Sequence, residues 1–203
     1  MRTLWGYDIE SDGMPPLITP DTLEELTAGK FTGDARIPKE LEAASAGIRD
    51  YVGWHLYPSA ECSVEINMQD EIVERTGRDL LVQLPTKYLS EVESVTLGGT
   101  AYDFSFKTNG ILRVYEVPHI LDRRLVLAVN YTAGLPDELM GGIAELVAHR
   151  VTHSLVSSYG VTNETAGGVS ITYNAAWINN SRATALPDDN KEVLAPYRLQ
   201  GVF

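Results

Sequence analysis

Residues 124–159 change their hydrophobic period part-way along the segment. In the first half, apolar side chains recur at the period of two that is typical of a strand. These positions are Leu125, Leu127, Val129 and Tyr131. In the second half, apolar side chains recur at the spacing of one helical face. These positions are Leu139, Ile143, Leu146, Val147, Val151 and Leu155. The pattern predicts a strand followed directly by a helix.

The start of this helix is predicted at Pro136. Proline suits the first helical position, because its missing N–H would be unpaired there, and the two acidic residues that follow favour the positive end of the helix dipole. Gly141 and Gly142 each cost about 1 kcal/mol relative to Ala within a helix, which indicates either a close packing contact or a weak helix start. We expect a helix over residues 136–159, with the rest of the chain packed on it.

Shorter apolar runs before this segment predict further strands. The expected strands lie at 62–67, 70–75, 79–84, 91–97, 101–106, 111–117 and 124–131. Gly98-Gly99 is a turn that requires positive φ, and Asn109-Gly110 predicts a hairpin with a type I′ turn. The spacing of about ten residues per strand fits a small antiparallel sheet or sandwich.

Helical patterns flank the strands. Thr19, as N-cap before Pro20, begins a short helix, and a second helix over 38–58 carries an apolar stripe at helical spacing. The stripe consists of Leu41, Ala44, Ile48, Tyr51 and Val52. Small residues beside it allow another element to approach closely: Ala43, Ala44, Ala46 and Gly47. A last short helix starts at 187–189, and Pro196 is expected to disrupt its end.

An antiparallel β-module between helices makes the predicted fold α+β. We expect a small helical bundle with this module inserted and a short C-terminal helix, all in a single domain of residues 1–203. Its parts are an irregular N-terminal arm with a short helix (1–37), a helix (38–58), the β-rich module (60–132), the central helix (136–159), a loop or tongue (160–187) and a C-terminal segment (188–203).

The charge balance excludes one class of function. The formal net charge of −12 argues against a protein that binds the phosphates of nucleic acid. Cys62 is the only cysteine, so no intrachain disulfide forms, and we expect it to be a small buried apolar residue. No signal peptide and no span of roughly 18 apolar residues are found, so no membrane association is expected.

One cluster of titratable residues stands out on the central helix. Glu145, His149 and His153 are spaced four residues apart and share a face, and two His at that spacing can bind a metal. The spacing differs from that of zinc proteases, and no Cys joins them. The preferred interpretation is a polar face in solvent or at a subunit contact. No nucleophile motif or phosphate loop is present, so neither catalysis nor a cofactor is predicted.

Four segments, in this order, resemble the head–tail connector (adaptor, or head-completion) proteins of tailed bacteriophages. They are the Ala-rich ELEAASAGIRDYVG, then LLVQLPTKYLSEVESVTLGGTAYD, then LVLAVNYTAGLPDELMGGIAELVAHRV, and finally LPDDNKEVLAPYRL. The most telling features are the Tyr-Thr-Ala-Gly-x-Pro turn and the Leu-x-Pro-Tyr-Arg ending. The segment before Gly33 is longer and more aromatic than in the family, and the module of 60–131 is elaborated, so no site is transferred to either.

The resemblance implies a structural virion protein. Such connectors form a ring, typically dodecameric, between the portal protein and a stopper or tail-completion protein, and they extend the channel for genomic DNA, which passes without specific binding. They are monomeric in the host cytoplasm before assembly and lie at the neck of the virion afterwards. The acidic charge and the absence of an active-site motif agree with this role.

The resemblance also implies interfaces. The C-terminal segment would dock on the portal through Leu194, Tyr197, Arg198 and Phe203. Removal of 187–203 would leave the fold intact but abolish portal attachment. Subunit contacts would involve Glu145, His149 and His153 on the central helix, and Tyr173 and Trp177 in the tongue. The strand-like VSITY of 169–173 needs a partner edge, which a neighbouring subunit could supply. Independently of the resemblance, Trp5 and Tyr7 in the N-terminal arm are apolar enough to dock on another surface, for which a neighbouring subunit is one candidate.

Two alternatives stay open. One is another neck protein, of the tail-terminator or stopper type, which would have fewer helices. The other, from a different class, is a small metal-dependent hydrolase built on Glu145, His149 and His153.

Overall fold

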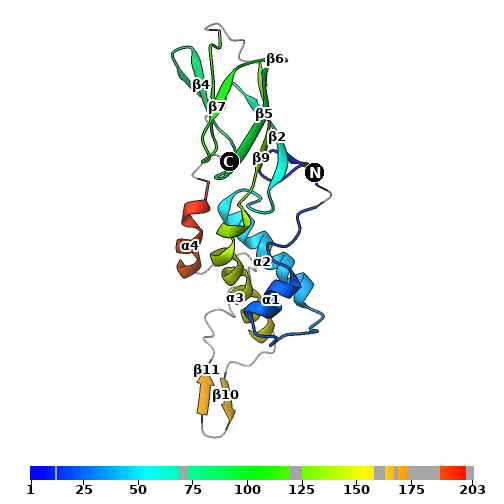
Figure 1. Cartoon of the computed structure of the whole chain (residues 1–203). Helices are drawn as coiled ribbons and strands as arrows, with labels where there is room; N and C mark the ends of the chain where they lie inside the picture. Colours follow the sequence, from blue (N-terminus) through cyan, green and yellow to red (C-terminus); the bar gives the residue numbers. More distant parts are fainter. Residues whose placement is uncertain are drawn as a thin grey trace. The chain divides into compact units, whose positions relative to one another are not determined.

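The computed structural model describes residues 1–11, 13–68, 73–118, 125–157, 163–166, 169–172 and 188–199 (Figure 1). Helices and antiparallel sheets together confirm the predicted α+β class. The chain forms two compact units. The β unit comprises Met1–Met14, Val52–Pro136 and Tyr197–Phe203, and the helical unit comprises Pro15–Tyr51 and Asp137–Pro196.

The β unit contains two antiparallel sheets. The first has the order β1 (Asp8–Ile9), β2 (Ala60–Asn67), β9 (Val126–Ala133), β5 (Leu89–Leu97) and β6 (Thr100–Ala101). The second has the order β3 (Val73–Thr76), β4 (Asp79–Gln83), β8 (Ile111–Val114) and β7 (Phe104–Phe106). The predicted strand 101–106 is thus wrong as a single element, because the chain leaves the first sheet after Ala101 and enters the second at Phe104.

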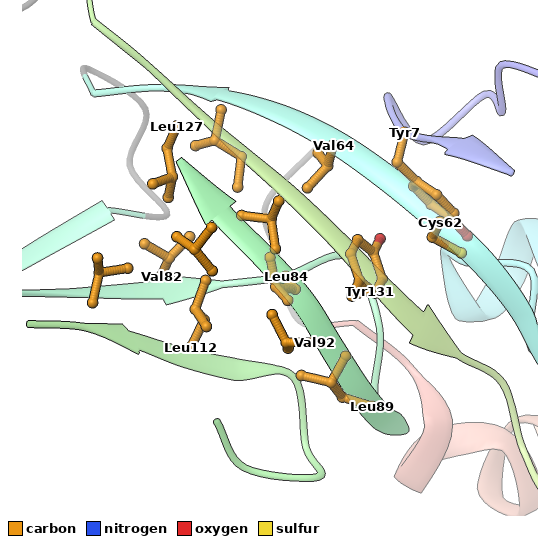
Figure 2. Close-up of a cluster of buried hydrophobic side chains, with 14 of the residues drawn as sticks. Tyr7, Cys62, Val64, Val82, Leu84, Leu89, Val92, Leu112, Leu127 and Tyr131 are labelled. Atoms are coloured by element: carbon orange, nitrogen blue, oxygen red, sulfur yellow. The ribbon is translucent and has the colours of Figure 1, made fainter. Parts of the chain in front are cut away.

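One hydrophobic core fills the β unit, and both sheets contribute to it (Figure 2). In β2, buried and exposed residues alternate along most of the strand, as expected for a strand with one covered face. Inward side chains of β4 and β8, such as Val82 and Leu112, pack with those of β9, such as Leu127. Burying one such side chain contributes roughly 1.5–3 kcal/mol. Of the two expected arrangements, a small antiparallel sheet or a sandwich, the core shared by two sheets agrees with the sandwich.

Two predicted turns have different outcomes. Gly98 and Gly99, between β5 and β6, both have positive φ, as predicted. Asn109-Gly110 does connect β7 to β8, but the type I′ prediction is wrong, because among these two only Gly110 has positive φ, at 86°. The Gly110 N–H donates to Lys107 O (3.0 Å) and the Lys107 N–H to Ile111 O (2.8 Å). That is a three-residue loop with a bulge at glycine.

The helical unit is built on α1 (Pro20–Leu26), α2 (Ile37–Val52), α3 (Gly141–Ser157) and α4 (Asp188–Leu194). As predicted, Thr19 caps α1, since its side chain accepts the Thr22 N–H. The small residues of α2 do allow a close approach, because a Cβ added to Gly47 would lie 3.2 Å from an Arg150 guanidinium nitrogen of α3. Ser154 of α3 also donates to Glu40 of α2 (2.6 Å).

The central helix begins later than predicted. A 3₁₀ turn covers η1 (Asp137–Leu139), and α3 starts at Gly141. Leu139 was placed on the inner stripe, but it is 43% exposed, and Met140 is buried instead. Gly141 and Gly142 are exposed, and a Cβ at either would meet nothing within 4 Å among the described residues. The two glycines therefore mark a weak helix start and not a packing contact.

Candidate interaction site

The outer face of α3 carries the first set of predicted contact residues. Glu145 and His149 are exposed and His153 is half-buried. The opposite face is formed by buried side chains, namely Ile143, Leu146, Val147, Val151 and Leu155. Partial burial, and secondly the charge of His149, lowers the pKa of His153 below its usual value. The His153 imidazole is therefore largely uncharged at neutral pH.

Among the described residues, no metal site is formed on this face. Within the described parts of the chain, no three His, Cys, Asp or Glu side chains are grouped closely enough to hold a metal ion. Glu145, His149 and His153 share one helical face, as predicted, but the described neighbours bring no further ligand to them. The metal-dependent hydrolase stays an untested alternative.

The C-terminal segment is tied to the β unit by backbone groups. A 3₁₀ turn, η3 (Ala195–Tyr197), follows α4, so the predicted disruption at Pro196 is confirmed. The Trp54 Nε1–H donates to Tyr197 O (2.8 Å), and the Leu199 N–H donates to Val52 O (2.9 Å). These bonds fix the course of the chain around Arg198.

The four predicted portal-contact residues differ in exposure. Leu194 is fully buried within this chain, so its side chain serves the chain's own packing. Tyr197 is half-buried and Arg198 is exposed. Phe203 lies outside the described residues. Removal of 187–203 would take away the buried Leu194 side chain and the two hydrogen bonds to Trp54 and Val52, so we expect it to lower the free energy of unfolding. That the fold stays intact without this segment remains a prediction.

The tongue is a two-stranded hairpin where the structure describes it. β10 (Asn163–Ala166) pairs with β11 (Val169–Thr172) in four antiparallel residue pairs. Among the described strands, these two pair only with each other. Tyr173 and Trp177, the predicted contact residues of this region, lie outside the described residues.

Tyr7 docks within its own chain and not on a neighbouring subunit. Its side chain is fully buried in the core of the β unit (Figure 2), and the His55 N–H donates to its hydroxyl oxygen (2.9 Å). His55 Nε2 lies 2.9 Å from Ala133 O. A carbonyl oxygen only accepts, so Nε2 carries the proton, and Nδ1 accepts the Tyr7 hydroxyl proton over 2.9 Å.

This buried Tyr7–His55 pair was missed at the sequence level. No motif joins residues 48 positions apart. The available signal was the aromatic character of the N-terminal arm, which indicates docking but not where. Its role in the structure is to anchor the arm to the end of β9.

The Tyr-Thr-Ala-Gly turn at the end of β9 depends on glycine. Gly134 has a φ of 145°, and an added Cβ would lie 2.4 Å from Ser59 Cα. The next residue, Leu135, donates its N–H to Leu56 O (2.8 Å). Backbone contact this close leaves no room for a side chain, so the turn that carries the family resemblance is fixed by its packing.

Carboxylates gather on the outward face of the first sheet. The Glu61 side chain hydrogen-bonds to Glu10, and this bond, with the charges of Glu10 and Glu93, raises the pKa of Glu61. A shallow depression of about 320 Å³ lies among these residues. Arg2 lies 3.7 Å from Asp8, which lines the same depression. This face would repel DNA phosphates.

Neither a scan against protein-family models nor a search of curated proteins finds a match to this chain. None of the helices in the described parts has both the length and the apolar content needed to cross a membrane.

Proposed function

We propose that this chain is a structural protein of a tailed bacteriophage, a head–tail connector that forms a ring between the portal and the tail or stopper. The ring would extend the DNA channel and complete the head at the neck of the virion. The observation that carries the proposal is the order of the four connector-like segments. They coincide with defined elements: α2, β4 to β6 with their glycine turn, β9 with α3, and α4 with the 3₁₀ turn after it.

The surface chemistry supports the same role. The net charge is −12, and the carboxylate cluster of Glu10, Glu61 and Glu93 lies on an open sheet face. A channel wall that DNA must slide past benefits from repulsion, since bound phosphates would hold the genome in place.

The portal contact is proposed at Tyr197 and Arg198. Arg198 is exposed, and the backbone bonds of Tyr197 to Trp54 and of Leu199 to Val52 hold it in a defined position. An exposed Arg on an ordered segment is a common anchor in interfaces. Leu194 does not take part, because its side chain is buried.

The substitution Arg198→Glu tests this contact. The portal protein encoded by the same genome is co-expressed with the wild-type chain, with Arg198→Glu and with Arg78→Glu. Arg78 is exposed at the turn between β3 and β4 and matches the change in net charge. We expect co-purification of the wild type and of Arg78→Glu, and at least ten-fold less Arg198→Glu on the portal. Equal binding by both variants would contradict the assignment of Arg198, and failure of the wild type to bind would contradict the function.

A further inference from the structure

The second sheet of the β unit has an open edge at β7. The Tyr115 N–H donates to Asp103 O (2.9 Å), and the Lys107 N–H donates to Ile111 O (2.8 Å). Hydrogen-bonded pairs alternate along an antiparallel ladder, so Ser105 is the residue of β7 that bonds to β8. The backbone groups of Phe104 and Phe106 therefore point away from β8.

Nothing in the described parts of the chain covers this edge. Ser105 and Phe106 are exposed, and Phe106, at 39%, is one of the few large apolar side chains on the described surface. The strand reads Phe-Ser-Phe, without proline or charge, and those are the residues that normally protect an edge from pairing. The Ser105 and Tyr115 hydroxyls are 2.7 Å apart and hold the strand in place.

The other sheet edges are poorer acceptors. β1 and β6 contain two residues each, which is too short for a stable ladder. β3 carries Glu74 and Arg75 within its four residues, and charges on an edge oppose pairing. β7 has three uncharged residues, so it is longer than β1 and β6 and lacks the charges of β3, and it is the described edge best suited to accept a strand.

The same chain contains two strands, β10 and β11, that form a separate two-stranded sheet. β10 and β11 pair only with each other among the described strands, and an isolated two-stranded hairpin is marginal in water. β11 reads Val-Ser-Ile-Thr, which is uncharged and rich in β-branched residues that favour strands. Its second edge is unpaired by any described strand.

We propose that β7 accepts β11 of a second copy of this chain, so that the hairpin of one copy extends the sheet of the next. The inference rests on the proposed ring and names the contact between its neighbouring subunits. Donor and acceptor are different surfaces, so the contact is head-to-tail, which is the kind that closes into a ring when the rotation allows. Main-chain hydrogen bonds supply the affinity in such strand addition.

Disulfide trapping tests the pairing directly. Cys62 is the only native cysteine and is buried, so introduced thiols can be followed in the wild-type background. Ser105→Cys or Phe106→Cys is combined with Ser170→Cys or Ile171→Cys, because adjacent residues of a strand point to opposite faces. Neighbouring strands bring Cα atoms within disulfide range. Oxidation of the concentrated protein, alone and bound to the portal, should give a ladder of linked multimers for at least one double variant.

The single-cysteine variants show whether a strand other than β11 pairs with the edge at β7. Each single cysteine should give at most trace dimer, and the wild type none. If Phe106→Cys alone dimerises as fully as the double variants, β7 pairs with β7 of a second copy, and the proposed donor is wrong. If no double variant links under either condition while portal-bound rings form, the inference is overturned and the proposed function stands. If the wild type forms no ring, the function fails, and the ladder in concentrated protein still decides the inference.

A backbone test avoids engineered disulfides. Phe106→Pro removes an N–H that faces away from β8, a site where an edge strand tolerates proline, whereas Phe106→Ala keeps that N–H and removes the side chain. We expect Phe106→Pro to reduce assembly at least ten-fold more than Phe106→Ala, with unchanged thermal unfolding. Equal assembly by the two variants would contradict strand addition at β7.

Discussion

Two tyrosines in the core of the β unit, Tyr7 and Tyr131, differ in the hydrogen bonding of their hydroxyl groups. Tyr7 exchanges hydrogen bonds with the backbone and ring of His55. The hydroxyl of Tyr131 is equally buried, yet it has no hydrogen-bond partner among the described residues. Burial, followed by the proximity of Cys62 and Tyr7, raises the pKa of Tyr131 well above its usual value. A buried polar group without a partner costs about 1–3 kcal/mol.

The same substitution at these two tyrosines should therefore change stability in opposite directions. Tyr7→Phe removes both hydrogen bonds between the Tyr7 hydroxyl and His55, and we expect a loss of about 2 kcal/mol in the free energy of unfolding. Tyr131→Phe removes an unsatisfied hydroxyl and should raise the free energy of unfolding by about 1 kcal/mol. Urea denaturation measures both. A destabilised Tyr131→Phe would mean that its hydroxyl has a partner in solution.

Cys62 gives the β unit a pH dependence in the alkaline range. Burial raises the pKa of its thiol from 9.0 to about 12, so the folded state keeps a proton that the unfolded state releases. The free energy of unfolding should then fall above pH 9, by at most about 1.4 kcal/mol per pH unit. Cys62→Ala should lack this contribution, so the two unfolding curves converge as pH rises from 9 to 12. Rapid alkylation of the native thiol at pH 8 would contradict the burial.

At the scale of elements, the β7–β8 hairpin is held by its turn. A Cβ at Gly110 would lie 2.3 Å from Thr86 O, and Leu84 donates its N–H to Gly110 O (2.9 Å). The turn therefore packs on the loop that follows β4. Gly77, in the turn between β3 and β4, also has positive φ (65°), but an added Cβ meets nothing within 4 Å among the described residues.

These two glycines form a matched pair for mutation. Gly77→Ala should cost about 1–2 kcal/mol, the conformational penalty of a positive φ. Gly110→Ala adds a backbone clash to that penalty and should cost at least 2 kcal/mol more. Thermal or urea unfolding of the two variants gives the difference. Equal costs would show that the Gly110 turn does not pack on Thr86.

At the scale of the whole molecule, the local pattern predicted the elements but not their grouping. The alternation at Leu127, Val129 and Tyr131 correctly predicted a strand with one buried face. The division into two units was not predicted, because each is assembled from segments far apart in the chain. Such contacts depend on three-dimensional packing, which hydrophobic periodicity does not encode.

The predicted contact residues also show that hydrophobic periodicity does not reveal three-dimensional packing. Glu145 and His149 are exposed, as helical spacing suggested, whereas the burial of Leu194 depends on packing that its sequence neighbours do not reveal. Tyr7 was expected to dock on some surface, with a neighbouring subunit as one candidate, and it completes the core of its own chain. Pattern alone separates apolar from polar residues, but it does not distinguish an interface from a core.

The central claim is that the chain is a ring-forming connector at the portal vertex. Cryo-electron microscopy of the phage particle tests it most directly, with density beneath the portal compared with the two units of this fold. We predict a ring of copies in direct contact with the portal, with Arg198 at that contact and the acidic sheet face of Glu10, Glu61 and Glu93 toward the DNA channel. A particle whose neck contains no density for this fold would contradict the account.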